Sequence, residues 1–137
     1  MVTILKSTYD RIIKHAESGY PNEVCGVLIG KNGKISEFKD CRNLNNERAH
    51  DRYELDPVSF QEADNWAREN KMEIIGIYHS HPDHPSIPSE FDRARAWPYW
   101  VYIIFSINTG KYNDARAWYL DDFDSMFQER KIELILG

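Results

Sequence analysis

The sequence has little that would place the protein outside the cell or in a membrane. Its 137 residues include two cysteines, and no apolar run approaches the roughly 18 residues that a membrane-spanning helix needs. The first twenty residues are too polar for a secretory signal peptide. These features disfavour disulfide-rich secreted proteins and membrane proteins, and we expect a soluble, cytoplasmic protein with no membrane partner.

Basic residues and linker-like segments are also scarce. The chain has 17 Lys and Arg against 22 Asp and Glu, a net charge of -5, with no Lys/Arg-rich run. Because most nucleic-acid affinity comes from neutralising phosphates with basic side chains, this composition disfavours a nucleic-acid partner. Repeats, low-complexity tracts and Gly/Ser linkers are absent. Residues 1–137 are therefore expected to form a single domain around one core.

The hydrophobic pattern predicts helices and strands in mixed order. Helical spacing of apolar residues predicts a helix over 6–18, with Ser7 as a candidate cap. The Asn32-Gly33 pair between two apolar runs predicts a tight hairpin. The other expected elements are strands at 24–29, 35–41, 52–55, 73–80, 100–107 and 115–120, helices at 57–70 and 89–97, and a last strand or helix at 127–136. The expected fold class is α+β, a mixed curved β-sheet flanked by helices.

Two histidines at the end of a buried strand form the most informative motif. His79 and His81 are spaced so that both imidazoles lie on one face of a strand, where neutral nitrogens can bind a cation such as Zn²⁺. The next residues, HPDHPSIP at 81–88, contain three prolines and are expected to form an irregular loop that folds back. Such a loop would bring the carboxylate of Asp92 to the histidines as a third ligand. Three protein ligands leave a fourth position for water, the arrangement of a catalytic zinc site.

Each of these residues also has a purely structural interpretation. Histidines two apart at a strand end are more often ordinary polar residues than a metal pair. Ser89 and Asp92 begin a helix as Ser-x-x-Asp, close to a capping box, and capping competes with metal ligation for Asp92. Glu23, directly before VCGVLIG, is either an exposed charge after a turn or the base that a zinc-activated water requires. The other histidines are expected at the surface: His15, His50 and His84.

The combined pattern resembles the signature of the JAMM (Jab1/MPN) metalloproteases, an upstream Glu followed by His-x-His-Pro, six residues and Ser-x-x-Asp. The matching positions are Glu23, His79, His81, Pro82, Ser89 and Asp92, and the resemblance covers roughly residues 3–120. It implies the MPN fold, which is cytidine-deaminase-like, and one Zn²⁺ per chain bound by His79, His81 and Asp92. It also implies that Glu23 is the general acid/base and that Ser89 stabilises the oxyanion.

The resemblance also implies a class of substrate. Family members hydrolyse amide or isopeptide bonds after the C-terminal glycine of ubiquitin or ubiquitin-like proteins. With no room for extensive insertions, the chain is similar to the minimal prokaryotic members, such as the peptidase that releases cysteine from a ubiquitin-like sulfur carrier. We therefore expect a zinc-dependent peptidase or isopeptidase that cuts after the Gly-Gly tail of a ubiquitin-like or sulfur-carrier protein. The alternative is a catalytically silent MPN scaffold, which would be expected to have lost a ligand or the glutamate.

The expected substrate segment is an extended tail with two small residues before the cut. A free strand edge beside the histidines could form hydrogen bonds with such a tail, and a narrow channel would admit only glycine-sized residues. Cysteine and a lysine side chain are both compatible with this interpretation as leaving groups. The sequence is likewise compatible with a monomer or a homodimer.

Overall fold

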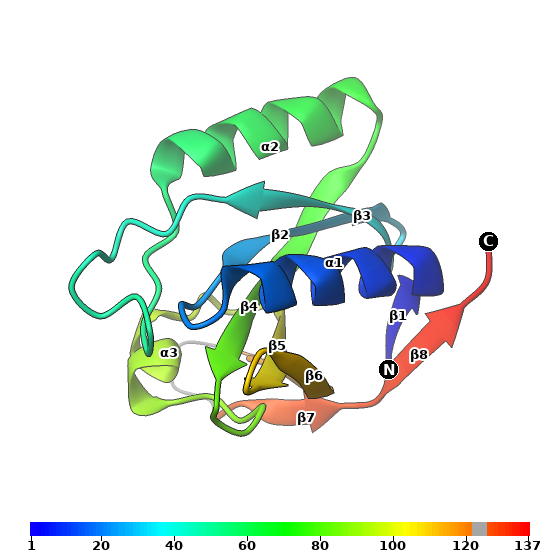
Figure 1. The fold of residues 1–137 in the computed structure, drawn as a ribbon. Helices are drawn as coiled ribbons and strands as arrows, with labels where there is room; N and C mark the ends of the chain where they lie inside the picture. Colours follow the sequence, from blue (N-terminus) through cyan, green and yellow to red (C-terminus); the bar gives the residue numbers. More distant parts are fainter. Residues whose placement is uncertain (122–125) are drawn as a thin grey trace.

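Strands and helices share one sheet-based architecture in the computed structural model, which describes residues 1–121 and 126–137. In chain order the elements are β1 (Val2–Leu5), α1 (Lys6–Gly19), β2 (Cys25–Lys31), β3 (Lys34–Cys41), α2 (Pro57–Glu69), β4 (Glu73–Pro82), α3 (Glu90–Arg95), β5 (Val101–Asn108), β6 (Lys111–Tyr119), β7 (Gln128–Arg130) and β8 (Ile132–Ile135). The strands form a mixed sheet in the order β7-β6-β5-β4-β2-β3-β1-β8 (Figure 1). The predicted α+β class is confirmed.

Local sequence signals explain where several elements begin and turn. Asn32 and Gly33, with φ of 54° and 76°, make the left-handed turn that joins β2 to β3. Helix α2 begins with Pro57, and the side chain of the capping residue Asp56 accepts a hydrogen bond from the N–H of Val58 at 3.1 Å. These positions match the sequence-based prediction.

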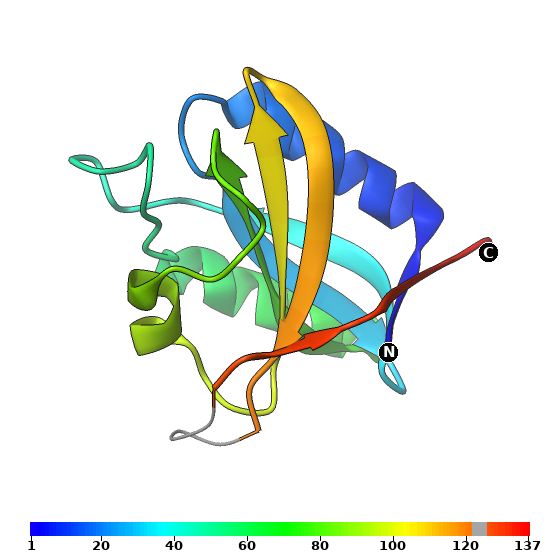
Figure 2. The same ribbon diagram turned by 90° about the horizontal axis from the view of Figure 1, so that it is seen from below.

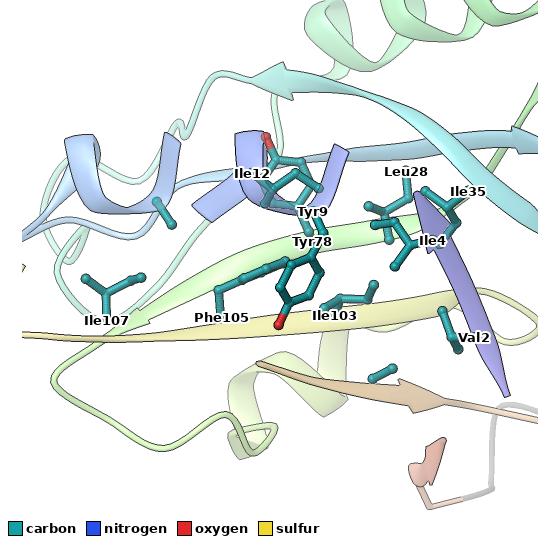
Figure 3. Close-up of a cluster of buried hydrophobic side chains, with 12 residues drawn as sticks. Val2, Ile4, Tyr9, Ile12, Leu28, Ile35, Tyr78, Ile103, Phe105 and Ile107 are labelled. Atoms are coloured by element: carbon teal, nitrogen blue, oxygen red, sulfur yellow. The ribbon is translucent and has the colours of Figure 1, made fainter. Parts of the chain in front are cut away.

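Helices α1 and α2 cover opposite faces of the sheet (Figures 1 and 2). On β2, Leu28 packs in the same apolar cluster as Ile12 of α1, and Figure 3 shows this cluster. Its neighbour Val27 points to the other face and packs with Ala63 and Ala67 of α2. The alternation along one strand therefore divides the core into an α1 layer and an α2 layer.

Strand β4 runs through the centre of the sheet and carries the two histidines. It pairs antiparallel with β2 and parallel with β5, so that His79 lies opposite Cys25 on one side and Ile104 on the other. The strand continues to Pro82, two residues beyond the predicted end at Ser80. The reason is that 81–82 still pair with β5, and because the β2 ladder ends at His79, Pro82 occupies an edge position where proline is tolerated.

Four other expectations need correction. Strand β1 was not predicted, and it pairs in parallel with both β3 and β8. Helix α1 has Leu5, not Ser7, at its N-cap. The segment 52–55 contributes only an isolated bridge between Leu55 and Asn43. The 127–136 region forms two strands, β7 and β8, at opposite edges of the sheet.

Among the described residues, no helix is both long and apolar enough to cross a membrane.

Candidate functional site

Three side-chain atoms from β4 and α3 converge on one point. The Nε2 atoms of His79 and His81 lie 3.2 Å apart. Asp92 Oδ2 is 3.2 Å from His79 Nε2 and 3.0 Å from His81 Nε2. All three residues are buried. The strand places both imidazoles on the α2 side of the sheet, and the first turn of α3 brings the carboxylate to them.

This donor set fits a zinc ion. Donor atoms that share one tetrahedral Zn²⁺ at about 2.0–2.1 Å lie about 3.3 Å from one another, close to the separations observed between these three atoms. Two imidazoles and one carboxylate are also the ligand types of catalytic zinc sites, which keep a fourth position open. The arrangement can therefore hold a metal without rearrangement of His79, His81 or Asp92.

The carboxyl group of Glu23 lies beside the donor set. One of its oxygens is within 4.8 Å of ligand atoms of His79 and His81. The side chain is buried, and among the described residues Oε1 has no hydrogen-bond partner. The interpretation of Glu23 as an exposed charge is therefore wrong. A buried, unpartnered carboxyl oxygen next to candidate ligands is available to a substrate or a water molecule.

Backbone contacts fix the start of β2 and with it Glu23. The N–H of Glu23 donates to the carbonyl of Ala49 at 2.6 Å. The next residue, Val24, exchanges two hydrogen bonds with buried Ser80 of β4: its N–H donates to Ser80 Oγ at 2.9 Å, and its carbonyl accepts from the Ser80 N–H at 3.1 Å. Ser80, between the two histidines in sequence, thus ties the glutamate's strand to the strand that carries them.

The two carboxyl groups of the site have opposite electrostatic environments. Burial, together with the negative charges of Asp92 and Asp51, raises the pKa of Glu23 to about 9. Burial also opposes ionisation of Asp92, but the neighbouring His79 and hydrogen bonds from His79, His81 and the Ser89 N–H outweigh it and lower its pKa. A pair of carboxyl groups with separated pKa values can divide its roles between a permanent anion and a proton carrier.

Burial likewise lowers the pKa of His79, although the negative charge of Asp92 opposes this. A lowered pKa favours the neutral imidazole. Neutral imidazole is the form that binds a metal ion.

The raised pKa of Glu23 predicts a pH-dependent stability of the metal-free protein. Above about pH 4.5 the unfolded chain releases the proton of Glu23, whereas the folded chain retains it up to about pH 9, so stability falls as pH rises through this window. In Glu23→Gln this contribution is absent. We expect the free energy of unfolding of the metal-free variant to exceed that of the metal-free wild type by about 1–3 kcal/mol near pH 7. Near pH 5 the difference should be smaller. Urea unfolding at both pH values measures the difference, and equal differences would contradict the assignment.

Ser89 makes the capping box that its sequence position suggested. Its Oγ accepts from the N–H of Asp92 at 3.0 Å, and its own N–H donates to Asp92 Oδ2 at 3.0 Å. The same Oδ2 also lies 3.0–3.2 Å from the Nε2 atoms of both histidines, so one carboxylate oxygen belongs to the cap and to the donor set. Because Ser89 Oγ acts as an acceptor in the cap, its hydroxyl hydrogen can be donated to another group.

Replacing Ser89 by alanine distinguishes the observed capping role from the expected role as an oxyanion donor. An oxyanion donor is worth roughly 10²- to 10³-fold in kcat, whereas a lost helix cap costs about 1 kcal/mol of stability and little activity. We expect Ser89→Ala to retain zinc and to show the roughly 10²- to 10³-fold loss in kcat of a missing oxyanion donor. Steady-state kinetics and thermal melting of the same preparations distinguish the outcomes. Near-normal turnover with a lowered melting temperature would leave capping as the only role.

The imidazole of His81 is oriented by the loop that follows β4. Its Nδ1 lies 2.8 Å from the carbonyl oxygen of Pro85, which directs Nε2 toward the donor set. The loop is anchored on both sides of Pro85: Ser106 Oγ donates to the carbonyl of His84 at 2.6 Å, and Ser86 Oγ donates to Asp114 Oδ1 at 2.7 Å. The proline-rich loop is therefore held against β5 and β6.

Three cavities adjoin or approach the donor set. One of about 310 Å³ is lined by Glu23, Asp51, His81, His84, Pro85, Ile87 and Ser89. A second of about 310 Å³ reaches Asp92 and is lined also by Tyr53, Phe91 and Arg95. The second cavity shares Leu55, Pro57, Ile77 and Trp97 with an apolar cavity of about 570 Å³ that extends to Trp100. A groove therefore leads from the candidate metal ligands to an aromatic surface.

Sequence reasoning placed His50 and His84 at the surface, where the structure has them, but was wrong for His15. His15 is half-buried, and its Nδ1 lies 2.9 Å from the hydroxyl of Tyr78. The supporting contacts of Ser80 and the Pro85 carbonyl were not predicted. The His-Ser-His pattern could have drawn attention to Ser80, but only the folded loop reveals the Pro85 contact.

Comparisons with known proteins agree with this geometry. The family of prokaryotic homologs of the JAB domain matches residues 5–121. A desampylase from Haloferax volcanii is 40% identical over 124 residues, which cover 83% of this chain and 85% of that protein. A CysO-cysteine peptidase from Mycobacterium tuberculosis is 28% identical over 125 residues, 89% of this chain and 84% of the peptidase.

A third relative differs in length. Tail tip assembly protein K of Escherichia phage N15 is 36% identical over 90 residues, 66% of this chain, and the match spans 34% of the phage protein.

Solved structures show the same fold. A protein from Desulfitobacterium hafniense superimposes with a TM-score of 0.86 at 26% identity, covering 100% of this chain and 94% of the other. A JAB1/MPN domain protein from Archaeoglobus fulgidus superimposes with a TM-score of 0.62 at 18% identity, covering 98% and 97%. The expectation of an enzyme of the metalloprotease class agrees with the desampylase and peptidase relatives. The chain belongs to the family of prokaryotic homologs of the JAB domain.

Proposed function

We propose that the protein is a zinc-dependent peptidase or isopeptidase that hydrolyses the amide bond after the C-terminal Gly-Gly of a ubiquitin-like or sulfur-carrier protein. In this proposal one Zn²⁺ per chain is bound by His79, His81 and Asp92. Glu23 is the general acid/base, and Ser89 stabilises the oxyanion. The observation that carries the proposal is the convergence of three donor atoms within 3.2 Å of one another beside the buried carboxyl group of Glu23.

The chemistry divides between the metal and the side chains of the chain. When bound, zinc supplies a Lewis acid that polarises the scissile carbonyl and lowers the pKa of water. Glu23 accepts a proton from the attacking water and returns it to the leaving nitrogen, a role that suits a carboxyl group whose pKa burial has raised. Ser89 donates its hydroxyl hydrogen to the oxygen that becomes negatively charged. Asp92 remains ionised throughout, because its surroundings lower its pKa.

The cavities around the site support an extended protein substrate. Glu23 lines one cavity and must face the leaving nitrogen, so this cavity suits the leaving group. The groove past Asp92 then suits the tail before the cut, and its aromatic end suits the body of a protein. At 76–79, β2 and β5 pair with both sides of β4, and at 81–82 only β5 does, so among the described strands the expected free edge is confined to the end of β4. The groove therefore holds most of the tail in this proposal, and only the end of β4 is open to strand pairing.

The relatives narrow the substrate class. Desampylase and CysO-cysteine peptidase relatives each cover more than four-fifths of their own length in the match to this chain. Their names support hydrolysis at a ubiquitin-like modifier or a cysteine-loaded carrier. A cut at the end of a tail would fit the groove and the leaving-group cavity.

A carrier fusion tests the function and its glycine selectivity. A ubiquitin-like sulfur carrier ending in Gly-Gly-X should be cut after the second glycine when zinc is supplied. Changing that glycine to Val should lower kcat/KM at least tenfold, about 1.4 kcal/mol, by steric exclusion near the scissile carbonyl. Mass spectrometry locates the cut, and progress curves give the rates. Equal cleavage of the Val fusion would refute the steric account, and no cleavage of either fusion would favour the silent scaffold.

A further inference from the structure

The two candidate metal-binding histidines are held in different ways. His81 Nδ1 contacts the carbonyl of Pro85 at 2.8 Å, the kind of contact that usually orients a metal-binding imidazole. His79 Nδ1 is buried and, within residues 1–121 and 126–137, has no hydrogen-bond partner. Its ring is stacked against Tyr53, with ring centroids 4.4 Å apart and planes inclined by 28°. His79 is therefore held by stacking on Tyr53, whereas His81 is held by a hydrogen bond.

Tyr53 is itself fixed by the side chain of Asn43. Asn43 Nδ2 donates to the carbonyl of Arg52 at 3.2 Å, and Oδ1 accepts from the N–H of Glu54 at 3.0 Å. These contacts hold the residues on both sides of Tyr53. The backbone adds a hydrogen bond from the Leu44 N–H to the Glu54 carbonyl at 2.8 Å. The ring of Tyr53 thus rests on a segment that cannot shift without breaking several hydrogen bonds.

The same amide also reaches the strand of the proposed general base. Asn43 Nδ2 donates to the backbone carbonyl of Glu23 at 3.2 Å. The Asn43 side chain therefore forms hydrogen bonds both with the residue bearing the candidate acid/base and with the segment that supports His79. A displacement of Asn43 would disturb a proton carrier and a metal ligand together.

We propose that Tyr53 is a positioning residue that orients the imidazole of His79 for the metal, and that Asn43 keeps Tyr53 and Glu23 in place relative to each other. The inference rests on the proposed metal site, not on the identity of the substrate. It predicts that the aromatic ring of Tyr53, rather than its hydroxyl, determines how tightly the site binds zinc.

Zinc affinity of the full chain, measured by competition with a chromophoric chelator, tests the role of the ring. Tyr53→Phe keeps the ring and should bind zinc within about threefold of the wild type. Tyr53→Leu should bind about 10- to 100-fold more weakly, the usual effect of removing a group that supports a ligand. The absorption spectrum of the Co²⁺-loaded protein should change in Tyr53→Leu and remain unchanged in Tyr53→Phe.

A matched variant controls for general loosening of the fold. Phe60 of α2 stacks on Trp100 with centroids 5.8 Å apart, and it lines neither the cavity at Glu23 nor the one at Asp92. Phe60→Leu should lower the melting temperature of the metal-free protein but leave zinc affinity unchanged. If Tyr53→Leu fails to fold, Asn43→Asp provides a second test. It keeps the acceptor for Glu54 but loses the donor to Arg52 and Glu23, and should weaken zinc binding about 3- to 10-fold.

The outcomes separate this inference from the proposed function. Wild-type zinc affinity and an unchanged cobalt spectrum in Tyr53→Leu, or equal losses in the Phe and Leu variants, would overturn the positioning role. A wild type that binds no zinc would overturn it as well. A wild type that binds zinc tightly but cleaves no Gly-Gly fusion would refute the proposed function, while the ranking of the Tyr53 variants would still decide the positioning role.

Discussion

Replacing Asp92 by alanine is expected to abolish zinc retention and to reduce peptidase activity by about 10⁴-fold or more. The carboxylate is buried against the two imidazoles at 3.0–3.2 Å, and it is the only anion among the three converging donors. Two neutral histidines alone would hold the metal weakly. A bound zinc ion would lower the pKa of water, and its loss would remove the nucleophile at neutral pH.

The capping role of Asp92 must be separated from ligation in this experiment. Asp92→Asn retains an oxygen that can accept the Ser89 N–H at the helix start, but it lacks the negative charge. It should therefore melt closer to the wild type than Asp92→Ala does while still losing zinc. Metal analysis of both purified variants, with activity assays after zinc addition, gives the answer. Full zinc occupancy in either variant would show that Asp92 is not a ligand.

Replacing Glu23 by glutamine is expected to lower kcat by about 10²- to 10⁴-fold while zinc remains bound. Glutamine has nearly the same shape but cannot carry a proton between the attacking water and the leaving nitrogen, and general acid–base catalysis contributes this range. Glu23 Oε1 has no hydrogen-bond partner among the described residues, so the substitution breaks no observed side-chain contact of that atom. Metal analysis and single-turnover kinetics of the same sample measure both properties.

A carboxylate outside the proposed substrate groove provides the control for the Glu23 variant. Glu62 of α2 is exposed and lines neither of the two cavities at the donor set. Glu62→Gln should therefore leave kcat within about threefold of the wild type, because the group is not placed to transfer a proton. If Glu23→Gln loses zinc together with activity, Glu23 is a ligand and not a proton carrier. If both variants lose activity equally, the loss results from removing a negative charge from the protein and not from a specific role of Glu23.

The sequence predicts the part of the site that depends on the spacing of residues close together in the chain. Alternation along β4 puts His79 and His81 on one face, and the Ser-x-x-Asp start of α3 explains both the cap and the position of Asp92. The sequence does not show that Glu23 is buried. That follows from pairing of Val24 with Ser80, residues 56 positions apart.

Features that depend on distant pairing were missed. Strand β1 is four residues long and pairs with β3 and β8. Of these two strands, β8 lies at the opposite end of the chain. A short strand without flanking turn residues gives no periodic signal of its own. Tyr53 lies in an irregular segment that hydrogen bonds of Asn43 hold, and its contact with His79 joins residues 26 positions apart. Loops that support a site are therefore the least predictable part of it.

The most direct test of the central claim is a titration of the metal-free protein with zinc while cleavage of a Gly-Gly-X carrier fusion is measured. The account predicts that activity is negligible without metal, rises in proportion to added zinc and reaches its maximum at about one equivalent per chain. The donor set of His79, His81 and Asp92 requires this stoichiometry. Full cleavage by the metal-free protein, or no cleavage at one bound zinc per chain, would contradict it.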